Sequence, residues 1–530
     1  MREAAPHPKA ATSALRPGVF VLLSVCFAVC FSASASDFRV LEPASFAHHI
    51  ERFNAMAPEL VTNHIPNAQA WLWLQRNIPL FECPDRDVEE IYYFRWWSYR
   101  KHLVKTPAGF VVTEFLTPVK HAGAYNTVSC AAGFHLAEGR WLRDGEYVDD
   151  YTRFWLRGNH GQPQPHFHKF SSWFAAAAYD RYLIDGDKKF LVNLLPDLVA
   201  DYRAWEKERQ STNGLFWQYD VADGMEESIS GSRTDKNLRP TINSYMFANA
   251  RAIGEVARLA KQPALAAEFD AKAATLKRLV EERLWDSDAQ IFKVLHENGQ
   301  FSDAREAVGF IPWMFALPDA KPAHAAAFAQ LADPQGFSAP LGITTAEQRH
   351  PRFRSHGIGT CEWDGAIWPF ATSQTLYALA NYLRSKTAPS INHQPSTINY
   401  FSSFLTYTRS QRADGQPYIG EYLDETTGDW INRNGRSACY NHSTYADLLI
   451  TGVVGLRPRA DDVVEIAPLL PPETWRWFCL DGVTYHGRTL TVIWDKDGSR
   501  YGRGAGLRVF AGRKQIAAAS RLEPVTGKLP

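Results

Sequence analysis

The chain lacks any surplus of charge, because 57 Lys and Arg residues balance 57 Asp and Glu residues. Surfaces that bind nucleic acid or anionic membranes need a basic excess, so this balance argues against both partners. Cysteine is also sparse: there are seven, with no Cys-x-x-Cys pair, and an odd five of them follow residue 36. The count does not imply a disulfide framework, although it allows one or two bridges.

Several catalytic signatures are absent from the sequence as well. It contains no Gly-rich phosphate loop, no Gly-x-Ser-x-Gly and no His-Glu-x-x-His. Without these motifs, the sequence gives no sign of a nucleotide site, a serine-hydrolase elbow or a helical zinc site. We therefore expect neither a cofactor nor a metal.

Long apolar runs are missing except at the N-terminus, where residues 18–31 are almost all apolar. Arg2, Lys9 and Arg16 precede this run, and small residues follow it at 32–36. This order is typical of a signal peptide, with cleavage near Ala35. The run is short for a membrane span, although an uncleaved anchor is an alternative. We expect a secreted or periplasmic protein that leaves the membrane once residues 1–36 are removed.

Helical patterns fill residues 87–456, where we predict twelve helices. Leu191, Leu194, Leu195 and Leu198 illustrate the 3.6-residue apolar spacing. Short connections pair neighbouring helices as antiparallel hairpins. The predicted helices are Asp87–Leu103, Asn126–Glu138, Glu146–Leu156, His166–Leu183, Lys188–Arg209, Pro240–Ala260, Leu265–Leu284, Ser302–Leu317, Pro322–Leu331, Asp364–Arg384, Thr397–Gln411 and Cys439–Val454. Six such hairpins form an (α/α)6 toroid, so we predict a mainly α fold whose inner helices surround a pocket.

The segments that flank the helical region have a different character. Residues 37–86 form an N-terminal extension, in which Pro43–Ala57 fits a helix. Residues 457–530 contain alternating or β-branched runs at 463–467, 489–494 and 506–510. Such runs predict strands, so we expect a small C-terminal β module.

The strongest chemical signal is an acidic loop that runs from Trp217 to Gly231, with Arg233 close behind. It carries Asp220, Asp223, Glu226 and Glu227. Glycoside cleavage needs one carboxylic acid to protonate the departing oxygen and one carboxylate to activate water or attack carbon. Crowded acids raise one another's pKa, which keeps a proton available near neutral pH. The alternative is a solvated acidic turn or a calcium site.

Three further motifs combine acids with aromatic or imidazole groups. Glu421 and Tyr422 lie in a Gly- and Thr-containing loop, and His442 opens the last predicted helix. Acids and indoles alternate in Trp363, Asp364 and Trp368, although Asp364 also fits a helix N-cap. On the first helix, Arg95 and Trp97 either reach the pocket or pack in the core. We predict that these side chains and the acidic loop line one sugar-binding pocket.

These motifs resemble those of the six-hairpin glycosidases of the glucosidase I, trehalase and mannosylglycerate hydrolase group. Gly224–Ser228 is similar to that group's Gly-Trp/Met-Asp-x-Ser motif, with Glu226 at the position of the general acid. Gly420–Gly428 is similar to its Glu-x-(Tyr/Asn)-x-x-x-Thr-Gly motif, with Glu421 at the position of the general base. Residues 363–369 resemble its pocket-lining Trp-x-Gly-Pro-Ile-Trp segment.

The resemblance implies inversion at the anomeric carbon of a terminal, α-linked sugar, with carboxyls about 6.5–9.5 Å apart. The sequence departs from the group where Glu226 replaces Asp, so Asp223 and Glu227 remain rival acids. Leu423, Asp364 and Ala366 also replace the residues that the group commonly has. A polysaccharide lyase on the same toroid and a non-catalytic carbohydrate-binding protein are the alternatives. The expected partner is an oligosaccharide or another glycoside.

Overall fold

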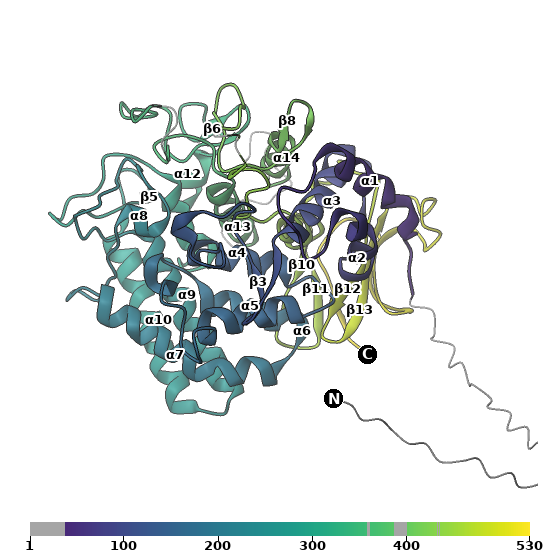
Figure 1. Cartoon of the computed structure of the whole chain (residues 1–530), viewed down its shortest axis with the longest axis horizontal. Coiled ribbons are helices and arrows are strands. Elements are labelled where there is room, and N and C mark those ends of the chain that lie inside the picture. The colour runs from purple at the N-terminus through teal and green to yellow at the C-terminus, as the bar shows by residue number, and fades with distance from the viewer. Residues whose placement is uncertain (1–37, 358–360, 386–399, 432, 434) are drawn as a thin grey trace, which may run out of the picture. The chain divides into compact units, whose positions relative to one another are not determined.

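The fold is given by a computed structural model that describes residues 38–357, 361–385, 400–431, 433 and 435–530 (Figure 1). Residues 39–530 form one compact unit. The predicted signal peptide lies outside the described residues. Within the described ranges, no helix is both long and apolar enough to cross a membrane. The five cysteines there are all free thiols, so none of the bridges that the sequence allowed is formed among them.

Helices dominate the region from residue 86 to residue 454, as the apolar spacing predicts. They are α3 (Arg86–Lys101), α4 (Ser129–Gly139), α5 (Glu146–Arg157), α6 (Phe174–Asp185), α7 (Lys188–Arg209), α8 (Asp220–Asp223), α9 (Pro240–Leu259), α10 (Pro263–Arg283), α11 (Ile311–Met314), α12 (His324–Ala329), α13 (Pro369–Arg384), α14 (Tyr400–Ser410) and α15 (Ala446–Leu448), which a π-helix continues to Val454. Together with the short α8, they make the mainly α toroid.

Burial separates the inner helices of the toroid from the outer ones. Helix α9 is buried on almost every face and packs against α6, α7, α10 and α11. Helix α10 buries only one stripe, which includes Phe269, Leu276 and Val280. In the same way, α13 is buried on most of its faces, whereas α14 buries only part of its surface. A helix that is apolar all round must be enclosed by neighbours, whereas an amphipathic helix faces solvent on one side.

Four predicted helices begin later than the sequence pattern suggested. One is the helix predicted at Ser302–Leu317, where α11 starts only at Ile311. Helix α6 starts at Phe174 instead of His166, and α13 starts at Pro369 instead of Asp364. Proline suits the first helical turn because its missing N–H has no partner there. The last inner helix starts at Ala446 instead of Cys439, so residues 439–445 cross the core without helical structure. Because these helices begin later, His442 and Trp368 lie in irregular segments and not in helices.

The C-terminal β module is larger than predicted and includes part of the N-terminal extension. Its main sheet is antiparallel with the order β1-β12-β13-β14-β15, and a second sheet has the order β10-β11-β16. The strands are β1 (Leu80–Glu82), β10 (Leu456–Arg457), β11 (Val463–Ile466), β12 (Trp477–Tyr485), β13 (Arg488–Asp495), β14 (Gly506–Ala511), β15 (Lys514–Ala519) and β16 (Val525–Lys528). Only β11, β13 and β14 were predicted.

The N-terminal extension is fastened to both neighbouring parts of the chain. It contains α1 (Ala47–Met56) and α2 (Ala70–Asn77), which pack on α3. Strand β1 pairs with β12, and the backbone N–H groups of Val40 and Leu41 donate to Asp481 at 2.7 and 2.9 Å. Figure 1 shows α1 and α2 beside the strands of the module. The extension therefore contacts both the toroid and the β module and links them.

Candidate active site

The acidic loop after α7 is a folded turn built around Asp220 and Gly224. The Asp220 carboxylate accepts a hydrogen bond from the Glu227 backbone N–H at 3.3 Å, and Met225 is fully buried as an anchor. Gly224 has a φ of +69°, and a Cβ there would lie 3.3 Å from the Cys130 sulfur. Glycine is therefore required at this turn, which fixes the direction in which the Glu226 side chain leaves the backbone.

Glu226 lies in a site that favours its neutral form. Burial raises the pKa of Glu226 from about 4.5 to about 7, and the charges of Asp220 and Glu421 add to the rise, while the exposed Arg233 opposes it. Removing a carboxylate from water and placing other carboxylates nearby both penalise ionisation. Glu226 consequently keeps its proton up to about neutral pH.

Glu421 comes from the loop between α14 and α15 and is held from three sides. Nη2 of Arg436 donates to its two carboxylate oxygens at 2.7 and 2.5 Å, and the Tyr440 hydroxyl donates to Oε1 at 3.4 Å. The His442 ring contacts the Glu421 carbonyl through Nε2 at 3.1 Å. Burial raises the pKa of Glu421 while the Arg436 guanidinium opposes the rise, and the buried His442 has its pKa lowered to about 3.

A stack of three rings forms the wall beside Glu421. Trp363 lies on Trp368 with ring centres 4.6 Å apart, and Trp368 lies on Tyr422 at the same distance. All three rings are buried. Within the described residues, the two indole N–H groups have no hydrogen-bond partner. An aromatic wall with unused donors suits a sugar ring, whose C–H face packs on aromatic carbon and whose hydroxyls accept hydrogen bonds.

Four of the predicted pocket residues are instead buried and bonded to other parts of the protein, which corrects their assignment to an open pocket. Asp223 is completely buried, and its Oδ2 pairs with Arg239 at 2.6 Å. Asp364 is also completely buried, and its Oδ2 accepts from the His356 backbone and ring at 2.9 and 3.0 Å. The other oxygen of each, Oδ1, is buried without a hydrogen-bond partner among the described residues, so the two carboxylates are enclosed by the protein.

The other two corrections concern the first helix of the toroid. The Arg95 guanidinium donates to Tyr407, Gln411 and Ser443 at 2.6–3.1 Å, so it joins α3 to α14 and to the segment before α15. Trp97 is fully buried, and its indole N–H donates to Asn54 of α1 at 2.8 Å. Both side chains are core elements of the toroid wall.

The remaining predicted residues lie on the acidic loop or next to it. Glu227 accepts from the Cys361 backbone N–H at 3.1 Å, which ties the acidic loop to the chain that precedes Trp363. Trp217 is half-buried, and its ring is covered by the Arg209 guanidinium at 4.5 Å and by Lys236 at 5.2 Å. The Trp217 ring is thus stacked with cations.

Sequence reasoning missed two residues that lie among the carboxyl groups. Arg436 pairs with Glu421, and the buried Glu114, at the end of β3 (Gly109–Val112), interacts with the charges of both Glu421 and Glu226. Glu114 follows the apolar run 110–112, and its place as a single acid after a strand was the only signal in the sequence that it could belong to the site. No signal in the sequence pointed to Arg436, because it lies in a loop whose path is determined only by the fold.

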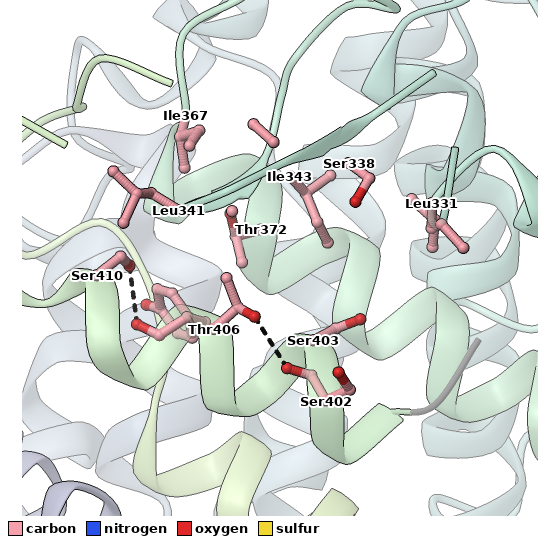
Figure 2. A pocket seen from close by; sticks show the side chains of 14 residues that line it. Leu331, Ser338, Leu341, Ile343, Ile367, Thr372, Ser402, Ser403, Thr406 and Ser410 are labelled. Carbon is pink, nitrogen blue, oxygen red and sulfur yellow. Dashed lines mark hydrogen bonds between the residues drawn. The ribbon is translucent and has the colours of Figure 1, made fainter. Parts of the chain in front are cut away.

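A separate cavity of about 400 Å³ lies between α14 and the chain around Leu341 and Ile367 (Figure 2). Hydroxyls of Ser402, Thr406 and Ser410 on α14 line one side, and Leu341 and Ile367 line the other. None of the 14 lining residues is charged. Without a carboxyl group this cavity cannot supply acid–base chemistry, so the carboxyl cluster is the better candidate for the reaction.

Comparisons with known proteins place two parts of the chain in known domain families. Residues 124–443 match the sequence model of the mannosylglycerate hydrolase MGH1-like glycoside hydrolase domain, and residues 456–516 match that of the glycosyl hydrolase family 65 C-terminal domain. The toroid and its β module thus match two domains that occur in glycoside hydrolases. The first match covers more than half of the chain, which therefore belongs to the MGH1-like glycoside hydrolase family.

Individual relatives match this chain over only part of their own length. A solved structure named a sialidase is 49% identical over 92% of this chain, with a TM-score of 0.88, and the chain covers 45% of it. A family 78 rhamnosidase of Bacillus sp. GL1 shares the fold alone, at 14% identity and a TM-score of 0.53; the aligned part is 79% of this chain and 40% of the rhamnosidase. An uncharacterized protein of Borreliella burgdorferi is 25% identical over 35% of this chain and 38% of its own length. The chain thus spans less than half the length of each.

Proposed function

We propose that this glycoside hydrolase removes a terminal, α-linked sugar with inversion, using Glu226 as the general acid and Glu421 as the general base. One observation carries the proposal: two interacting carboxyls have different neighbours, because acids raise the pKa of Glu226 further while the Arg436 guanidinium pairs with Glu421. Burial and neighbouring acids keep Glu226 neutral up to about pH 7, whereas Arg436 contacts both oxygens of Glu421 and stabilises its charge. Such a division of environments is how paired carboxyls acquire acid and base roles.

The proposed reaction follows from these protonation states. Glu226 gives its proton to the glycosidic oxygen as the bond from that oxygen to the anomeric carbon breaks. Glu421 takes a proton from water, whose oxygen attacks the anomeric carbon from the opposite face, which inverts its configuration. A raised pKa makes Glu421 a stronger base, and the stack of Trp363, Trp368 and Tyr422 supplies an apolar wall for the sugar.

The first experiment identifies the substrate and the stereochemistry together. Aryl glycosides and plant oligosaccharides with α-linked mannose, glucose, arabinose or rhamnose are incubated with the enzyme, and NMR follows the first anomer released. We expect the β-anomer from an α-linked substrate. Release of the α-anomer would point to a retaining mechanism and would overturn the base role of Glu421. A sialoside belongs in the same panel, because the relative named a sialidase contains a domain similar to this chain.

The Glu421→Gln variant separates hydrolysis from the two alternative functions. A general base contributes about 10²–10⁴-fold to the rate, so the variant should lose turnover and still bind the substrate. Exposed Glu523→Gln is the matched control, which should keep full activity. An unsaturated product from a uronide substrate would identify a lyase, and binding without turnover in the unaltered enzyme would identify a carbohydrate-binding protein.

We also propose that the protein is exported, which rests on the pattern of residues 1–36. Expression of the full chain followed by N-terminal sequencing of the extracytoplasmic form should show cleavage near Ala35. An uncleaved N-terminus in the membrane fraction would instead indicate an anchor.

A further inference from the structure

Glu114 is a buried carboxyl group within the carboxyl cluster that the proposed mechanism does not use. Its exposed fraction is 4%. Its backbone is fixed on both sides: its N–H donates to the Asn126 carbonyl at 3.1 Å, and its carbonyl accepts from the Asn441 N–H at 3.0 Å. The side chain forms a hydrogen bond with the Tyr440 hydroxyl, and its Oε2 has no partner among the described residues. Glu114 is therefore held rigidly beside Tyr440 and away from solvent.

With Glu421 ionised opposite Arg436, the charges around Glu114 balance only if Glu114 and Glu226 are both neutral. Its neighbours include two other carboxyls, Glu226 and Glu421, and one guanidinium, Arg436, which is paired with Glu421. Cys130 also faces it, and Tyr151 lies within reach of its charge; burial raises the pKa of that thiol and that phenol, so both are neutral. With Glu114 and Glu226 protonated, one anion faces one cation, whereas ionising all three acids would bury two uncompensated charges.

The Tyr440 hydroxyl supports the same conclusion independently, because it has a single proton. It contacts Glu421, to which it donates at 3.4 Å, and it also contacts Glu114. Once the proton is directed at Glu421, the phenol oxygen can only accept at Glu114. The contact is then a hydrogen bond only if Glu114 is the donor, which requires that Glu114 carries a proton.

We propose that Glu114 is a positioning residue that stays protonated, donates to the Tyr440 oxygen and so holds the Tyr440 proton on Glu421. This inference rests on the proposed function, in which Glu421 is the base. It leaves Glu421 as the one ionised carboxyl of the three. The hydrogen bonds from Glu114 to Tyr440 and from Tyr440 to Glu421 also fix the orientation of the Glu421 carboxylate, whose two oxygens accept from Arg436.

Variants of Glu114 distinguish a neutral donor from a charged group. Glu114→Gln keeps a donor of the same shape, so kcat should stay within about threefold and the acid limb of kcat/KM should not move. Glu114→Leu removes the donor, and kcat should fall about five- to tenfold, the size of one hydrogen bond, with KM unchanged. Adding Tyr440→Phe to Glu114→Leu should cause a smaller loss than Tyr440→Phe causes alone, because the contact between Glu114 and Tyr440 is already gone and only the hydrogen bond to Glu421 remains to be lost. Thermal melting checks that each variant is folded.

The opposite kinetic result would overturn the proposal. If Glu114→Gln is as impaired as Glu114→Leu, or moves the acid limb, the site needs an ionised Glu114 and the proposal is wrong.

Infrared spectroscopy tests the protonation state without any substrate. The difference spectrum of the unaltered enzyme minus Glu114→Gln, recorded at pH 9, should contain the carbonyl stretch of a protonated carboxyl. A carboxylate band in its place would overturn the inference even if every variant remained active. Because the spectrum does not depend on turnover, it also separates the two proposals. An active Glu421→Gln enzyme would refute the mechanism, whereas the band reports on Glu114 alone.

Discussion

Glu226→Gln should make the protein more stable in alkaline solution while abolishing its activity. The variant keeps the size of the side chain and removes its ionisation. In the unaltered protein the folded state holds the Glu226 proton up to about pH 7, whereas the unfolded chain releases it near pH 4.5. The folded state therefore binds more protons between these values, and stability falls as the pH rises through this window.

The size of the effect follows from the same pKa. A rise from 4.5 to about 7 corresponds to about 3 kcal/mol, at about 1.4 kcal/mol for each pH unit. The free energies of unfolding of the two proteins should be similar at pH 4 and should differ by up to about 3 kcal/mol at pH 8, with the variant more stable. This follows because the glutamine never carries the buried negative charge.

Urea denaturation at half-unit pH intervals measures the difference, and it needs no knowledge of the substrate. Glu523→Gln, at an exposed site near the C-terminus, should follow the unaltered protein at every pH. Parallel curves for Glu226→Gln and the unaltered protein would refute the reasoning. They would mean that Glu226 ionises at its usual pH and has no proton to donate near neutrality.

Four further substitutions test other parts of the site and its surroundings. Arg436→Met should raise the pKa of Glu421 and move the acid limb of kcat/KM upward by about one pH unit or more; an unmoved limb would show that the ion pair does not tune the base. Asp223→Asn strands a buried arginine and should cost about 3–5 kcal/mol of stability, which a loss of activity without a lower Tm would contradict. Trp368→Phe should raise KM about fivefold and, because the indole is buried, also lower Tm, whereas Trp97→Phe should lower only Tm; equal effects on KM would remove Trp368 from the pocket wall.

Most of the helices could be predicted from apolar periodicity in the sequence. Helices such as α7 and α9 lie within a residue or so of their predicted bounds, since a 3.6-residue pattern over 20 residues has few alternative structures. Periodicity failed where the chain is buried without being helical. Residues 440–445 are buried although most of them are polar, and they cross the core as irregular chain whose polar groups bond to Glu114 and Glu421. Strand β1 was missed because its partner, β12, lies about 400 positions away in the chain.

Among the site residues, the sequence by itself determined which carboxyls to consider, because Glu226 and Glu421 lie in loops rich in glycine and aromatic residues. The burial of each carboxyl then distinguished candidate acids from structural ones, and only the tertiary structure could show that burial. Asp223 and Glu226 are three positions apart on one loop, yet the first is enclosed with Arg239 and the second keeps its proton beside Glu421. The pKa of a carboxyl depends on its solvation and on the charges around it, and Glu114, Arg436 and Tyr440 reach this site from distant parts of the chain.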